Sequence, residues 1–124
     1  MDPFREFNHA LKRFIRFLDT AIPDHMQIRV MKTAYKTLKH INKRWPHKCF
    51  VETLESDHAD KLRAKDEAFF TGNDFSIPLF NEFVQNMQEV WKRVDGGFKE
   101  RVWDHLTELL DLSKACHIAR TVRA

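Results

Sequence analysis

The sequence predicts an all-α protein, a compact bundle of about five helices with a core rich in phenylalanine and leucine. Apolar residues recur at spacings of three and four along several stretches, which keeps their side chains on one face of a helix. The 124 residues include only 3 glycines and 4 prolines, too few for the many tight turns of a β-sandwich. Eleven phenylalanines stand against one tyrosine, which indicates rings selected for packing because phenylalanine has no polar group.

The first two helices are predicted from their caps and breaks. Asp2 is the expected N-cap and Pro3 the first residue of a helix that ends near residue 20. Pro23 interrupts the chain, and Asp24 with Gln27 forms a variant of the capping box that begins the second helix, predicted to end near residue 43. Their apolar faces are Phe4, Phe7, Leu11, Phe14 and Leu18 in the first helix and Ile28, Met31, Tyr35 and Leu38 in the second.

Three further helices are predicted after Trp45. Trp45-Pro46 ends the second helix, because the residue before a proline disfavours helical geometry. The third helix begins at Pro46, and its course through residues 55–66 stays open. The turn at residues 72–74 precedes a fourth helix, capped by Ser76 and continuing to about Val94. The break at residues 95–97 precedes a fifth, which starts at Phe98 and extends as far as Val122.

Length and composition indicate one domain, residues 1–124, with enough residues to bury its own core. No apolar run approaches the ~18 residues that a membrane span needs, so we expect no contact with membranes. The first residues contain no apolar signal segment. Two isolated cysteines, Cys49 and Cys116, are expected to be free thiols in a reducing compartment. Together these features predict an intracellular protein.

Positive charge is concentrated in the first half of the chain. Residues 1–50 hold eleven Lys and Arg against four Asp and Glu, whereas residues 51–100 hold six against eleven, within a net charge of +3. Many of the basic residues lie beside the apolar faces of the first two helices. These are Arg5, Lys12, Arg16, Arg29, Lys32, Lys36, Lys39 and Lys43. Such stripes predict a surface for nucleic acid or an acidic partner, although lysine also simply fills solvated helix faces.

Other candidate sites have simpler structural explanations. Asp66, Glu67 and Asp74 could offer oxygen ligands, but the spacing does not fit a calcium loop, and helix starts and turns also favour these residues. The His47/Cys49 and Cys116/His117 pairs are spaced too tightly for a usual zinc site, so we expect exposed histidines and buried thiols. The Leu106–Leu110 segment matches an LxxLL docking peptide, but inside an amphipathic helix it is expected to belong to the core. No metal, cofactor or catalytic residue is predicted.

A series of motifs occurs in order in the second half of the chain. They are Ile41-Asn42-Lys43-Arg44-Trp45-Pro46, Lys65-Asp66-Glu67-Ala68-Phe69-Phe70, Asn73-Asp74-Phe75-Ser76, Trp91 and Lys99-Glu100-Arg101-Val102-Trp103. Over residues 41–113 the chain resembles a group of small, uncharacterised proteins encoded by large nucleocytoplasmic DNA viruses, including algal viruses. Thr71 and His105 depart from the group's pattern. The resemblance implies a viral source and an all-helical fold but no activity. It gives Lys65, Asp66, Glu67, Phe69, Phe70, Asp74, Trp91 and Trp103 a structural role.

The expected function is therefore that of a non-enzymatic viral protein of the host cytoplasm or nucleus. It would act as a protein-interaction or structural component, of the virion or of an assembly complex, through a protein partner or self-association. The alternative is a nucleic-acid-binding protein that uses the basic faces of the first two helices without reading base sequence.

Overall fold

The computed structural model describes residues 2–22, 26–55, 59–60, 63–65 and 94–122. Within these ranges the chain forms four α-helices, α1 (Pro3–Ala21), α2 (Met26–Ile41), α3 (Trp45–Phe50) and α7 (Gly96–Val122), and a π-helical turn, η1 (Val51–Glu55). The all-helical prediction is confirmed for this part of the chain. The helix expected over residues 76–94 lies outside it, so the count of about five helices stays a prediction.

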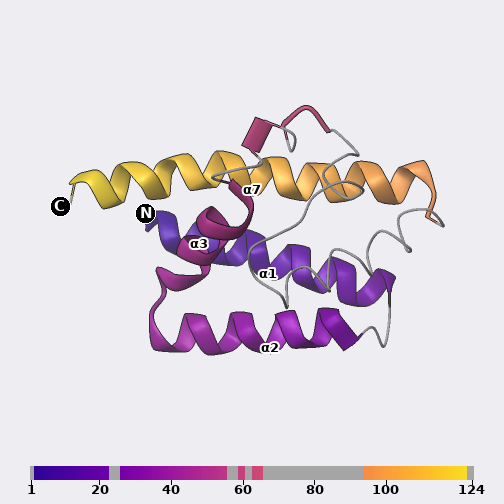
Figure 1. The fold of residues 1–124 in the computed structure, drawn as a ribbon, viewed down its shortest axis with the longest axis horizontal. Helices are drawn as coiled ribbons and strands as arrows, with labels where there is room; N and C mark the ends of the chain where they lie inside the picture. Colours follow the sequence, from indigo (N-terminus) through magenta and orange to yellow (C-terminus); the bar gives the residue numbers. More distant parts are fainter. Residues whose placement is uncertain (1, 23–25, 56–58, 61–62, 66–93, 123–124) are drawn as a thin grey trace.

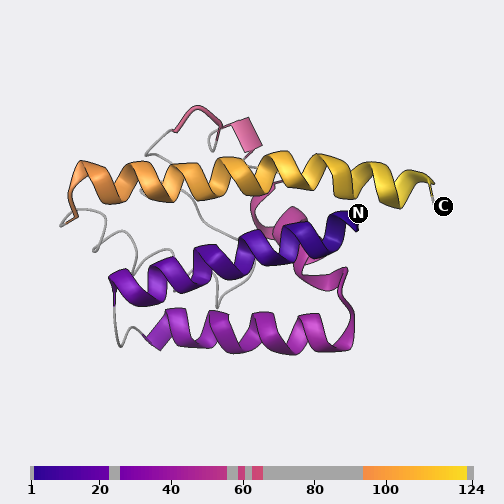
Figure 2. The ribbon, with the colours of Figure 1, turned by 180° about the vertical axis from the view of Figure 1, so that it is seen from behind.

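Helix α1 lies between α2 and α7, as the two opposite views in Figures 1 and 2 show. The 27 residues of α7 correspond to about 40 Å of helix, and α7 packs along α1. Phe17 stacks on Phe98 with ring centroids 5.3 Å apart, and Phe14 stacks on His105 at the same distance. Short α3 crosses near the N-terminus of α1 (Figure 1). Helix α7 covers one side of α1, and α2 packs against another side. The basic residues beside the contact between α1 and α2 therefore lie next to each other.

The helix ends follow local hydrogen bonding. The Phe4 amide donates to Asp2 Oδ1 at 3.0 Å, which confirms the predicted N-cap of α1. Helix α2 ends at Ile41, two residues earlier than expected, because Asn42 forms the turn: its Oδ1 accepts from the Arg44 amide at 3.0 Å. A side-chain acceptor two residues before the donor is typical of asparagine turns.

Asp95, the first residue of the predicted break, forms the N-terminal cap of α7. Asp95 Oδ1 accepts a hydrogen bond from the Phe98 amide at 2.8 Å, which satisfies an amide left free in the first turn of a helix. Helix α7 therefore begins at Gly96, two residues before the predicted start at Phe98, and it extends to Val122 as predicted.

The core contains buried residues of α1, α2, α3 and α7. They are Phe4, Phe7, Ala10, Leu18, Ile28, Phe50, Val102, Trp103, Leu106, Leu109, Leu110 and Cys116. Leu106, Leu109 and Leu110 are at most 3% exposed, so the LxxLL segment belongs to the core and is unavailable to a partner's groove. None of the helices in the described ranges has both the length and the apolar composition that crossing a bilayer requires.

Candidate functional site

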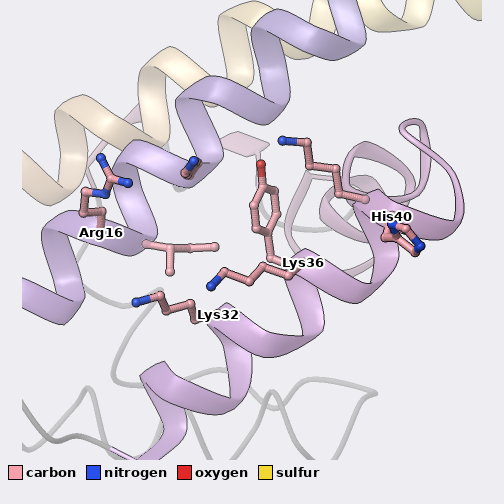
Figure 3. A pocket seen from close by; sticks show the side chains of 8 residues that line it. Arg16, Lys32, Lys36 and His40 are labelled. Carbon is pink, nitrogen blue, oxygen red and sulfur yellow. The ribbon is translucent and has the colours of Figure 1, made fainter.

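The basic faces of α1 and α2 line a single groove of about 640 Å³ (Figure 3). Two cations come from α1 and three from α2. The two predicted basic stripes therefore lie on opposite sides of the same groove. The lining residues are Lys12, Ile15, Arg16, Lys32, Tyr35, Lys36, Lys39 and His40. On each helix the basic residues are three or four positions apart, so they share a face.

Hydrogen bonds beneath the groove connect α1 with α2 and with the segment that follows α2. Ile15 and Tyr35 are 3% and 6% exposed, and the Tyr35 hydroxyl donates to the backbone carbonyl of Asn8 at 2.9 Å. Asn8 Nδ2 donates in turn to the carbonyl of Lys43, beyond the end of α2, at 2.8 Å. Burial raises the pKa of Tyr35, so its hydroxyl keeps the proton that this hydrogen bond uses.

Acidic residues of the described ranges neutralise few of the cations that line the groove. Lys32 Nζ lies 3.4 Å from Asp19 Oδ2, and Lys39 Nζ lies 5.9 Å from the centre of the Tyr35 ring. Within the described ranges Lys12, Arg16 and Lys36 make no ion pair. Their positive charges therefore face the groove without a carboxylate from that part of the chain.

Three residues of the predicted surface do not line the groove. Arg5 and Arg29 are exposed elsewhere on α1 and α2, and Lys43 Nζ contacts Asp2 Oδ2 at 2.5 Å. This hydrogen bond with Lys43 lowers the pKa of Asp2 against the opposing effect of burial. In contrast, His40 does line the groove. Its spacing of four from Lys36 could have indicated this, but the charge count treats histidine as neutral.

A second polar cluster lies where α3, η1 and α7 meet. His47 and Ser113 are both 0% exposed, and His47 Nε2 lies 2.7 Å from Ser113 Oγ. Arg120 Nε donates to His47 Nδ1 at 3.3 Å. Glu55, at the end of η1, hydrogen-bonds Ser113 and accepts from His117 Nε2 at 2.6 Å. His47 and His117 were considered as possible zinc ligands beside the cysteines, and no sequence pattern connects them with Ser113, Glu55 or Arg120.

The hydrogen bonds of this cluster define the position of the His47 proton. Burial lowers the pKa of His47 to about 4, and electrostatic interactions with Arg120 and His117 add to the effect against the opposing charge of Glu55. The imidazole is therefore neutral at pH 7. A guanidinium only donates hydrogen bonds, so Nδ1 accepts from Arg120 and Nε2 carries the proton, which it donates to Ser113.

This arrangement resembles a serine–histidine–carboxylate triad in composition but not in chemistry. In a triad the histidine nitrogen beside the serine must accept the hydroxyl proton, whereas here that nitrogen already carries one. Neither His47 nor Ser113 is accessible to a substrate. The hydrogen bonds of Ser113 and His117 outweigh the burial of Glu55, so the pKa of this carboxyl is lowered and it stays ionised. The cluster is a hydrogen-bond network, buried at His47 and Ser113 and partly exposed at His117, that links α3 and η1 to α7.

The cysteines and histidines differ from the sequence expectation. His47 is buried, whereas an exposed histidine was expected, and Cys49 is exposed, whereas a buried thiol was expected. Both expectations are wrong, and only Cys116 of the two thiols is buried as expected. A position in α3 that faces α1 and α7 explains the burial of His47, whose ring centroid lies 5.0 Å from that of Phe7. Burial raises the pKa of the Cys116 thiol to about 11. Among the described side chains, no three of His, Cys, Asp or Glu converge on a metal site.

The motif residues from the family resemblance divide into two groups. Trp103 is 3% exposed in the core, and Lys65 Nζ lies 3.2 Å from Glu100 Oε2 on α7. The other residues to which the resemblance gives a structural role lie outside the described ranges: Asp66, Glu67, Phe69, Phe70, Asp74 and Trp91. The structural role expected for Asp66, Glu67 and Asp74, in preference to oxygen ligation of a metal, therefore stays a prediction.

Comparison with known proteins gives no match for this chain: no protein-family model, no curated protein and no solved structure is significantly similar to it.

Proposed function

We propose that this protein binds the phosphate backbone of nucleic acid without reading base sequence. The observation that supports the proposal is the single groove between α1 and α2, which collects five cations of the two predicted stripes. Phosphate contacts of this kind supply the sequence-independent part of nucleic-acid affinity.

The composition of the groove supports backbone contact over base recognition. Arg16 is its one guanidinium group, and the other four cations are lysines, which act as point charges toward phosphate. Tyr35 is the one aromatic ring among the lining residues besides the imidazole of His40. Because the Tyr35 ring is 6% exposed and its hydroxyl is bonded to Asn8, it offers no platform on which a base could stack.

Fluorescence anisotropy of a labelled duplex tests this function. Lys32 is paired with Asp19, so Lys12, Arg16, Lys36 and Lys39 are the four cations most available to phosphate. Four contacts predict that affinity falls about 150-fold when salt rises from ~50 to ~200 mM. The Lys12→Glu/Lys36→Glu variant should lose binding at ~50 mM salt.

Lys48 and Lys114 provide a matched control, because both are exposed and lie outside the groove. The Lys48→Glu/Lys114→Glu variant changes the net charge equally and should retain most of the affinity. Equal losses in the two double variants would mean that overall charge, and not the groove, attracts the duplex. Unchanged binding by Lys12→Glu/Lys36→Glu would exclude the groove as the site.

The second candidate is the protein-interaction or structural role expected for an intracellular viral component, without catalytic activity. It is supported by the resemblance over residues 41–113 and by the large apolar side chains exposed on the described surface. The most exposed are Met26 at 72%, Ile118 at 65% and Ile41 at 59%. This hypothesis keeps the fold of about five helices with a core rich in phenylalanine and leucine. Light scattering that shows self-association would favour it.

A further inference from the structure

The groove is concave and lined by two helices, so it limits the size of the anion that can bind, which a basic stripe on a single helix does not. Its lining combines the buried side chains of Ile15 and Tyr35 with exposed cations from both helices, of which Arg16, Lys32 and Lys36 are labelled in Figure 3. Its volume of about 640 Å³ lies within the range of small-molecule sites, and its mostly basic lining favours an anion.

The cations are also close together along the helices. Lys12 and Arg16 are separated by one turn, and Lys32 to Lys39 span seven residues, about 10 Å at the rise of an α-helix. The helix axes of a packed pair lie about 8–10 Å apart. The backbone positions of these five cations thus lie within an area about 10 Å across. Asp19, beside Lys32, is the one carboxylate that the described ion pairs bring to these five cations.

We infer that the groove binds a compact anion in which several phosphate groups are covalently linked, such as a polyphosphate chain. Neighbouring phosphates of this ligand contact Lys12 and Arg16 on one wall and Lys36 and Lys39 on the other at the same time. Orthophosphate has only one phosphate group, so it gains fewer charge-assisted hydrogen bonds than a linked chain. Bringing like charges this close is unfavourable in the free protein, and a polyvalent anion relieves the repulsion on both helices.

This inference does not depend on nucleic acid as the natural source of the phosphates. A free polyphosphate and a nucleic-acid backbone share the chemistry of successive phosphates, but they present it at different spacing. Binding of the two anions is therefore measured separately.

Isothermal titration calorimetry of the full chain with sodium tripolyphosphate tests the inference, with orthophosphate compared at the same ionic strength. We expect one tripolyphosphate per chain, bound at least about tenfold more tightly than orthophosphate. The Lys12→Glu/Lys36→Glu variant should weaken tripolyphosphate at least about tenfold, while Lys48→Glu/Lys114→Glu changes it little. Far-UV circular dichroism of both variants verifies that the helices are retained, and the milder Lys36→Gln variant replaces the double variant if they are not.

Equal affinity for the two anions, or equal weakening by both double variants, would overturn the inference. Duplex binding without tripolyphosphate binding would also overturn it and would leave the proposed function intact. Tripolyphosphate binding at the groove without duplex binding would support the compact site and refute the proposed function.

Discussion

The buried imidazole of His47 makes the stability of this protein depend on pH. In the folded chain its pKa is lowered to about 4 from an ordinary value of 6.5, because the ring is 0% exposed and Arg120 donates to its Nδ1. Below pH 6.5 the unfolded chain therefore binds a proton that the folded chain excludes. Stability from this group is fully present above pH 6.5 and is lost as pH falls toward 4.

The magnitude follows from the difference between the two pKa values. Lowering the pH from 7.5 to 5.0 should reduce the free energy of unfolding by about 2 kcal/mol through His47 alone, with a limit of about 3 kcal/mol near pH 4. Glu55 faces the same cluster, and its pKa is also lowered. The stability that Glu55 contributes is lost only at more acidic pH, below its ordinary pKa of 4.5. His47 and Glu55 therefore affect stability in different pH ranges.

Urea denaturation at pH 7.5 and pH 5.0 measures the effect. The His47→Gln variant serves as the control, because it retains a side chain that can donate and accept but cannot titrate. It should show about 2 kcal/mol less loss between these two pH values than the native chain. The native imidazole, followed by NMR, should remain neutral at pH 5.0. Titration of His47 near pH 6.5, or equal pH dependence in both proteins, would refute this account of the buried network.

Three further substitutions test the packing by chemical denaturation at pH 7.5. Tyr35→Phe should cost about 1 kcal/mol or somewhat more, because it removes the donor to the buried Asn8 carbonyl; no change would contradict that hydrogen bond. Asp2→Ala should cost about 1 kcal/mol through loss of the N-cap acceptor for Phe4, and a loss below about 0.3 kcal/mol would argue against the cap. Leu109→Ala, at a residue 1% exposed, should cost about 2–5 kcal/mol, and a surface-like effect would contradict its place in the core.

Local rules predicted the elements of this fold better than its contacts. The Asp2 cap and the α7 boundary near Val122 depend on a few neighbouring residues, and the structure agrees with both. Helix α2 ends two residues earlier than predicted because Asn42 forms a turn of its own, whereas the prediction relied on Pro46 to end the helix. Burial of Leu109 was predictable because its helical spacing places it on the apolar face.

The site required information that no single helix contains. Each basic stripe was visible in the sequence, but their meeting across Ile15 and Tyr35 depends on which face of α1 packs against α7. Lys43 belongs to the stripe by spacing, yet the end of α2 places it beside Asp2. His47 was unpredictable for the same reason, since its partners Ser113 and Arg120 are 66 and 73 positions away.

The dependence of duplex affinity on salt concentration tests the central claim most directly. With phosphate contacts from Lys12, Arg16, Lys36 and Lys39, log affinity plotted against log salt should have a slope of about −3.6. Replacing Lys36 by alanine should reduce the steepness by about 0.9, and replacing Lys114 should leave it unchanged. A slope near zero, or one that Lys36→Ala does not alter, would contradict nucleic-acid binding through the groove between α1 and α2.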